Sequence, residues 1–139
     1  MLPPERVAIV GVLNATPDSF SDGGRFVSGE ARVDRDAAVD AAAALLAGGA
    51  HVLDVGGEST RPGARTIPAE QEAHRVVPVI EAVAKRFDAP LWVDTRKSEV
   101  ARAALAAGAC AVNDVSGLRF DAALAGVVAR AGAGLVLGH

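Results

Sequence analysis

Hydrophobic residues gather in five short runs along the chain. The runs begin at Val7, His51, Leu91, Cys110 and Gly134 and read VAIVGVLN, HVLDVGG, LWVDT, CAVNDVSG and GLVLGH. They are rich in apolar and β-branched residues and are continuous, without the strict alternation of a half-exposed strand. Continuous runs of this length are typical of parallel strands that are covered on both faces. The pattern therefore predicts five parallel strands.

Alanine-rich segments with a helical spacing of apolar residues separate the runs. We expect helices over residues 36–46, from about 68 to 87, 98–108 and 121–131. Gly48 and Gly49 follow the first helix as a stop signal, and Ser98 is the expected N-cap of the third. Pro78 lies inside the second segment, which predicts either a kink or a later start of that helix. The alternation of strand and helix indicates an α/β protein.

Two α/β architectures fit this alternation, an open doubly wound sheet and a (β/α)₈ barrel, also called a TIM barrel. Such a barrel takes about 250 residues. The chain has 139 residues, so it would supply the first half of a barrel, with about five strands and four helices. A fifth strand without a following helix would leave an apolar edge uncovered, so we expect a further part beyond His139. Because nothing in the composition divides the chain, we interpret residues 1–139 as one domain.

Composition and charge exclude several kinds of partner. The net charge is -3 with both signs interspersed, so neither a nucleic-acid stripe nor a membrane-binding face is expected. The start of the chain, MLPPERVAIV, lacks the pattern of a signal peptide, and no run reaches the ~20 residues of a membrane span. The single cysteine, Cys110, cannot form an internal disulfide, and its small apolar neighbours predict a buried packing role. We expect a cytoplasmic protein.

Polar residues occur where the predicted strands end, which is where both architectures place their active sites. In chain order they are Asn14, Asp54 with Glu58, Asp94, Asn113 with Asp114, and His139. Carboxylates and amides that converge on one face suit a flat heterocycle with amide-like edges, because they offer both donors and acceptors. Asp94 and Asn113 end the cleanest runs and are the strongest candidates. For Asp54 and Asp114 a structural role in a turn remains equally acceptable.

Two connections between the predicted elements are unusually long. The first begins NATPDSFSDGG at residues 14–24, whereas an ordinary connection takes about 2 to 6 residues. The second reads GGESTRPGARTIPAEQ at residues 56–71 and begins with the possible anion-binding stretch GGESTRPG. Its glycines permit close backbone approach, Ser59 and Thr60 offer hydroxyl groups, and Arg61 can bind a phosphate or carboxylate in two places. It is neither a P-loop nor a GxGxxG motif, and a plain surface loop remains the alternative.

Other residues favour structural interpretations. His51 begins a strand and His74 lies on a charged helix face, so we expect both to be structural or exposed, and we expect Trp92 in the core. Three histidines this dispersed do not make a zinc site. No Ser-His-Asp or Cys-His set is visible in the sequence, so it predicts no protein nucleophile.

Three segments together resemble the signature segments of the dihydropteroate synthase family. They are GVLNATPDSFSDGG, DVGGESTRPGA and VDTRKSEVARAALAAGACAVNDVSGL, and the resemblance covers essentially the whole chain. It implies a (β/α)₈ barrel, commonly a homodimer, that acts in folate biosynthesis and is the target of sulfonamides. The implied reaction joins 6-hydroxymethyl-7,8-dihydropterin diphosphate to 4-aminobenzoate and releases diphosphate with the help of Mg²⁺.

The resemblance also implies roles for single residues. Asn14 would contact Mg²⁺ through its amide oxygen, a hard ligand. Asp94 and Asn113 would hydrogen-bond the pterin ring. The implied substrate-binding set is Asp94, Asn113, Thr60, Arg61, Pro62, Phe20 and Ser19, with Phe20 and Pro62 forming a wall of the aminobenzoate pocket. The implied catalytic set is Asp94, Arg61 and Asp18.

The family pattern also includes residues that this sequence does not offer. An aspartate after the fifth strand, a later lysine and an arginine–histidine pair cannot be assigned, and Gly138 stands where the family usually has methionine. We therefore expect the amino-terminal half of a synthase, which alone would fold poorly or pair with another half barrel and would turn over weakly. Two alternatives are a methyltransferase that moves a methyl group from methyltetrahydrofolate to a corrinoid protein, and a non-catalytic half barrel. The segments TPDSFSDGG and STRPG favour the synthase.

Overall fold

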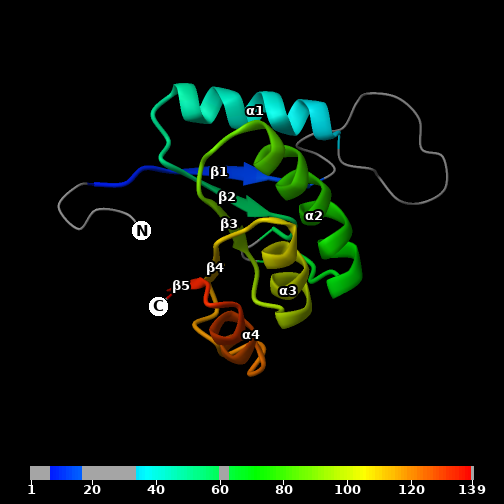
Figure 1. The fold of residues 1–139 in the computed structure, drawn as a ribbon. Helices are drawn as coiled ribbons and strands as arrows, with labels where there is room; N and C mark the ends of the chain where they lie inside the picture. The colour runs from blue at the N-terminus through cyan, green and yellow to red at the C-terminus, as the bar shows by residue number, and fades with distance from the viewer. Residues whose placement is uncertain (1–6, 17–33, 60–62, 139) are drawn as a thin grey trace.

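Five parallel strands and four helices alternate along the protein (Figure 1). The computed structural model describes residues 7–16, 34–59 and 63–138. The strands are β1 (Val10–Asn14), β2 (Val52–Gly56), β3 (Leu91–Asp94), β4 (Ala111–Asp114) and β5 (Gly134–Leu137). The helices are α1 (Arg35–Ala47), α2 (Ala69–Arg86), α3 (Ser98–Ala107) and α4 (Leu124–Ala131). The predicted order of elements is confirmed.

The strands lie in their order along the chain, β1-β2-β3-β4-β5. Each helix packs against the next one, and Figure 1 shows the four helices wrapped around one side of the sheet. A doubly wound sheet would place helices on both faces and would change direction within the strand order. The arrangement is therefore that of half a (β/α)₈ barrel.

The hydrophobic core lies between the sheet and the helices. Leu13, Val55, Val93 and Val112 are in register across β1 to β4, and all of them are buried against the helices. Small side chains let the helices come close to the strands. At Gly57, just after β2, an added Cβ would lie 2.8 Å from the Val76 Cγ1 atom of α2, so only glycine fits there.

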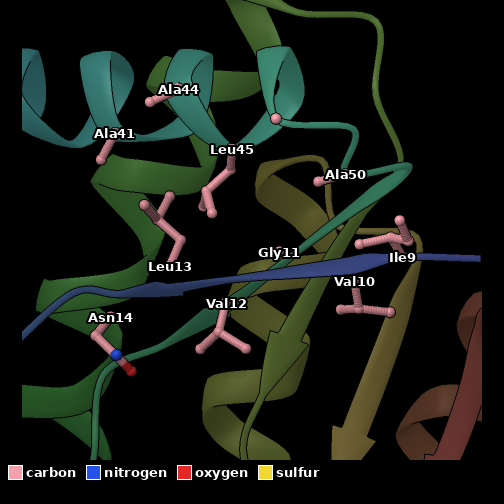
Figure 2. A pocket seen from close by; sticks show the side chains of 11 residues that line it. Ile9, Val10, Gly11, Val12, Leu13, Asn14, Ala41, Ala44, Leu45 and Ala50 are labelled. Atoms are coloured by element: carbon pink, nitrogen blue, oxygen red, sulfur yellow. The ribbon is translucent and has the colours of Figure 1, made fainter.

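The edge strands leave apolar surface exposed. A hollow of about 620 Å³ runs between β1 and α1 (Figure 2). Its lining residues are Ile9, Val10, Gly11, Val12, Leu13, Asn14, Ala41, Ala44, Leu45, Gly48 and Ala50. Val12 is 60% exposed and Leu137 of β5 is 50% exposed. The apolar edge predicted for the fifth strand is therefore present in the described part of the chain.

Several boundaries differ from the predicted ones. Strand β1 begins at Val10 instead of Val7, and α4 begins at Leu124 because the preceding Asp121 forms a turn. The Asp121 carboxylate accepts the Ser98 N–H at 2.8 Å and the Ala123 N–H at 2.9 Å.

Inside and before the helices, two further predictions are corrected. Helix α2 runs continuously through Pro78, so the later start proposed for it is wrong. Lys97, and not Ser98, is the N-cap of α3.

Two predictions about burial are wrong, whereas those for the histidines are confirmed. Cys110 is exposed, because the preceding Ala109 is the residue of this segment that packs into the core. Trp92 is only half-buried, since it lies on the sheet face that points away from the helices. His51 and His74 are both exposed, and the His51 Nδ1 atom accepts the Ile9 N–H at 3.2 Å. Among the described helices, none has the length and apolar character needed to cross a membrane.

Candidate functional site

One row of residues crosses the sheet at the carboxyl ends of the strands. It lies on the face that points away from the helices, which we call the open face. Asn14, Gly56, Asp94 and Asn113 are mutual register partners from β1 to β4. Because side chains alternate along a strand, this row faces away from the core row that contains Leu13. Figure 2 shows the Asn14 side chain on the opposite side of β1 from Leu13. The predicted convergence of Asn14, Asp94 and Asn113 is therefore present.

Asp54 joins this face from the neighbouring row. Its Oδ2 atom accepts a hydrogen bond from the Asn113 Nδ2 atom at 2.8 Å, although the residues are far apart in sequence. Asp54 is only 5% exposed, and its buried Oδ1 atom has no hydrogen-bond partner among the described residues. Burial raises the pKa of Asp54, and the bond from Asn113 opposes that rise. The question that the sequence left open for Asp54 is thus resolved in favour of the open face.

Asp94 is the most strongly perturbed acid of the site. Burial raises its pKa to about 7, and neighbouring carboxylates, first among them Asp54, add to the increase. Near neutral pH its side chain can therefore either accept a hydrogen bond as a carboxylate or donate one as an acid. A carboxyl with a pKa this close to neutrality is a feature of functional sites.

Gly56 is the one residue of the row without a side chain, and it lies between Asn14 and Asp94. A Cβ placed on Gly56 would lie 3.6 Å from both the Cβ and the Oδ2 atoms of Asp94, an ordinary contact distance. A larger side chain would extend over the same open face. The site thus combines a position without a side chain with the acceptors and donors of Asp94, Asn113 and Asp54, groups that can hydrogen-bond the edge of a planar polar ring.

Asp114 does not belong to this face. It follows Asn113 directly and therefore points to the helix side of the sheet, where it is fully buried. Its carboxylate accepts the N–H groups of Ser116 at 2.8 Å and Leu118 at 2.7 Å. These bonds hold a turn in which Leu118 has a φ of 65°. Of the two roles that the sequence left open for Asp114, the structural role in a turn is therefore the one that the structure shows.

Glu58 is held in a buried ionic cluster that the sequence interpretation missed. We call Glu58, Glu72, Arg96 and Lys97 the Glu58 cluster. Lys97 Nζ pairs with Glu58 Oε2 at 2.6 Å and also with Glu72, while Arg96 pairs with Glu58 Oε1 at 2.9 Å. Partial burial opposes ionisation of Glu58, but the bonds from Lys97, the Ile67 N–H and Arg96 outweigh it and lower the pKa.

A signal for this cluster was present in the sequence. Glu72 has a helical spacing with Val76, Val79 and Val83, all of which are buried on α2. A glutamate on an apolar helix face needs a cation, because an unpaired buried charge is very unfavourable. The pattern would have predicted a buried partner, but not which lysine or arginine supplies it.

The sequence profile described as pterin binding enzyme matches residues 10–139. The chain belongs to the pterin binding enzyme family. It is 44% identical over 135 residues to the dihydropteroate synthase of Synechocystis, a match that covers 97% of this chain and 45% of the relative. The chain thus spans about half the length of the curated relatives that it matches.

The chain is also similar to solved structures of dihydropteroate synthases. The Xanthomonas albilineans dihydropteroate synthase with 4-aminobenzoic acid is 46% identical, with a TM-score of 0.87, over 99% of this chain and 49% of that chain. The same enzyme in complex with 7,8-dihydropteroate is 42% identical, with a TM-score of 0.81, over 99% and 47% of the two chains. The half-barrel arrangement is therefore shared with these structures.

Some of the predicted site residues lie outside the described residues. They are Asp18, Ser19, Phe20, Thr60, Arg61, Pro62 and His139. Their roles stay predictions.

Asn14 is the residue that the resemblance assigns to Mg²⁺. Its side chain is exposed at the carboxyl end of β1, on the open face that also carries Asp94. Within the described ranges, no group of three or more His, Cys, Asp or Glu side chains could hold a metal ion. Mg²⁺ in phosphate sites uses one or two protein oxygens together with substrate phosphates and water. A single exposed amide oxygen at this edge fits that mode of binding.

Proposed function

We propose that this chain carries the pterin-binding half of a dihydropteroate synthase. The reaction would condense 6-hydroxymethyl-7,8-dihydropterin diphosphate with 4-aminobenzoate to give dihydropteroate and diphosphate. The observation that carries the proposal is the open face on which Asp94 lies beside the bonded pair Asp54 and Asn113. Its support from relatives is the similarity to synthases whose structures contain 4-aminobenzoic acid or 7,8-dihydropteroate.

The polar residues of the open face suit the edge of a pterin ring. The bond to Asp54 fixes the orientation of the Asn113 amide, so its carbonyl oxygen and second N–H remain for a ligand. Asp94 in its ionised form accepts from ring N–H and amino groups. An acceptor held in a partly buried site discriminates strongly, because a ligand without matching donors would leave it unpaired.

The chemistry needs no protein nucleophile. The bond between the pterin methylene carbon and the diphosphate oxygen breaks, and the electron pair leaves with diphosphate. The amine of 4-aminobenzoate then bonds to that carbon and loses a proton. The negative charge of Asp94 stabilises the positive charge that develops on the pterin. Mg²⁺ held at Asn14 would supply positive charge to the departing diphosphate.

The remaining parts of the proposal rest on the resemblance. Phe20 and Pro62 would form a wall of the aminobenzoate pocket, with Ser19 and Thr60 beside them. Arg61 would bind an anionic substrate group. Asp18, which lies in the first connection, would be a catalytic residue. We further propose a cytoplasmic homodimer that sulfonamides inhibit.

Diphosphate release by the purified 139-residue chain tests this function. The assay contains dihydropterin diphosphate, 4-aminobenzoate and Mg²⁺, with each component left out in turn. We expect slow release that requires both 4-aminobenzoate and Mg²⁺ and that is lost in Asp94→Ala. Release that continues in Asp94→Ala, or that ignores 4-aminobenzoate, would contradict the proposal.

One observation favours a second candidate, a half barrel that binds pterin without turnover. The chain spans about half of its relatives, and the edges of β1 and β5 are without a strand neighbour in the described residues. Pterin binding by a folded sample that releases no diphosphate would identify this second function.

A further inference from the structure

Asp54 is a buried carboxylate that takes no step of its own in the proposed reaction. It is 5% exposed, and its Oδ2 atom accepts one hydrogen bond, from Asn113 Nδ2 at 2.8 Å. Its Oδ1 atom is buried and has no partner among the described residues. The ion pairs that the described residues form all use Glu58 or Glu72, so none of them neutralises Asp54. A buried charge without a cation is unfavourable, so its place on the open face needs an explanation.

Any effect of Asp54 on a ligand has to pass through its neighbours. The Oδ1 atom is buried, and the Oδ2 atom is already bonded to Asn113. Asp54 also lies two positions before Gly56 in β2, one row further from the carboxyl edge, where it is in register with Trp92 of β3. The residues of the outer row that stand between Asp54 and a ligand are Asp94 and Asn113.

The bond between Asn113 and Asp54 depends on which way the carboxamide is turned. A rotation by a half turn would exchange the Asn113 Nδ2 and Oδ1 atoms and bring a carbonyl oxygen to the place from which Nδ2 now donates over 2.8 Å. A carbonyl oxygen and a carboxylate oxygen at this distance repel each other, because both are acceptors and carry negative charge. The charge of Asp54 therefore selects the orientation with Nδ2 towards Asp54.

A carboxamide held in one orientation distinguishes between ring edges. Asn113 keeps its carbonyl oxygen and one N–H for a ligand, which are an acceptor and a donor on one planar group. This pair matches an edge where an amino group stands beside an unprotonated ring nitrogen, as when an asparagine reads adenine. The 2-amino group and N1 of a pterin have this pattern. A carbonyl oxygen in place of the amino group leaves N1 with a proton, and the edge then matches only the reversed amide.

We propose that Asp54 is a positioning residue that determines which ring the site accepts, because it holds the Asn113 carboxamide in the orientation that pairs with the 2-amino edge of a pterin. This inference rests on the proposed function, since it concerns how the same open face recognises its pterin. Asp54 takes part in no bond that the reaction makes or breaks. Its contribution is selectivity.

Asp54 also acts on Asp94 through its charge, an effect that pH separates from the first. Burial raises the pKa of Asp94 to about 7. Four neighbouring carboxylates add to the increase, namely Asp54, Glu72, Asp114 and Glu58. Removal of the Asp54 charge therefore lowers the pKa of Asp94. At about pH 8.5 Asp94 is mostly ionised with or without that charge, so differences in binding at this pH do not come from its titration.

Asp54→Asn tests the inference with almost no change in side-chain shape. The new amide can accept from Asn113 Nδ2 or donate to Asn113 Oδ1, so both orientations of Asn113 become available. Calorimetric titration at about pH 8.5 compares 6-hydroxymethylpterin with 6-hydroxymethyllumazine, in which a carbonyl oxygen replaces the 2-amino group. The matched control is Asp40→Asn, which removes the same charge from an exposed position on α1.

We expect the wild type and Asp40→Asn to bind the pterin about tenfold more tightly than the lumazine, the factor for one hydrogen bond left unmade. In Asp54→Asn this preference should fall to about threefold or less, because the lumazine binds more tightly while the pterin Kd changes by no more than about threefold. An unchanged preference in Asp54→Asn would overturn the inference, whether the two Kd values stay constant or rise together. So would a wild type that binds both rings equally.

A second background shows whether Asp54 acts through Asn113. In Asn113→Ala the preference for the pterin should be small, and adding Asp54→Asn should leave it within about twofold, because the amide to be oriented is gone. A loss of preference in the double variant as large as the loss caused by Asp54→Asn alone would overturn the inference.

Failure of the proposed function gives a different result. If a folded wild type binds neither ring, the proposed function fails, and proton exchange of the Asn113 side-chain NH₂ group, followed by NMR, then decides whether Asp54 holds the amide. Exchange about tenfold faster in Asp54→Ala than in the wild type supports the fixed orientation. Equal exchange rates in the two proteins contradict it.

Discussion

Burial beside Asp54 raises the pKa of Asp94 to about 7, and this shift has a consequence for folding. The unfolded chain ionises Asp94 near pH 4, whereas the folded chain keeps its proton up to about pH 7. Between these values the folded state binds more protons than the unfolded state, so stability falls as the pH rises. Below pH 4 both states are protonated, so the pH dependence due to Asp94 ends there and the stability is no longer reduced by its ionisation.

Asp94→Asn removes this titration and should therefore change the pH profile of stability. At pH 8 the variant should be more stable than the wild type, because only the wild type carries the penalty for a buried charge there. At pH 4.5 the difference in stability should be much smaller. Urea unfolding at the two pH values measures the effect, with Asp40→Asn on the exposed face of α1 as control. A difference between Asp94→Asn and the wild type that does not depend on pH would contradict the assigned pKa.

For single residues, the sequence predicts a role correctly where the position along the strand decides that role. Asp94 and Asn113 end strands, and the register places both on the open face. Asp114 differs from Asn113 by one position, and one position reverses the face of a strand. The partners of Glu58 could not be predicted, since Lys97 lies 39 residues further along the chain.

The packing of α2 against β2 depends on Gly57. A Cβ at this position would lie 2.8 Å from Val76 Cγ1 and 3.2 Å from Glu72 Cγ. Gly57→Ala should therefore push α2 away from the strand end and lower the free energy of unfolding by about 1 to 3 kcal/mol. Urea unfolding checks the value.

Gly56→Ala is the matched control for stability. Its Cβ would make only ordinary contacts with Asp94, at 3.6 Å, and the free energy of unfolding should change little. Equal stability of Gly57→Ala and Gly56→Ala would show that α2 does not pack as closely as described.

The elements themselves were largely predictable, because long periodic patterns dominate local exceptions. The five apolar runs became the five strands, and the helical spacing in α2 continued through Pro78. The ends were less predictable. Asp121 caps a turn instead of starting α4, since its carboxylate binds the Ser98 N–H of another element. Tertiary contacts of this kind have no signature in the local sequence.

The described residues form half of a (β/α)₈ barrel. Its relatives are about twice as long, and the apolar hollow between β1 and α1 lies beside Val12, which is 60% exposed. Exposed apolar surface at a strand edge favours association with another chain or segment. The expectation that the isolated chain folds poorly or pairs with another half barrel stays a prediction.

The measurement that tests the account most directly is calorimetric titration of the pterin substrate into the folded 139-residue chain. We expect saturable binding that weakens by about tenfold or more in Asp94→Ala and in Asn113→Ala, since each loses hydrogen bonds to the ring. Asp40→Asn should bind like the wild type. Wild-type binding that survives both substitutions, or no binding by a folded sample, would contradict the claim that this open face is a pterin site.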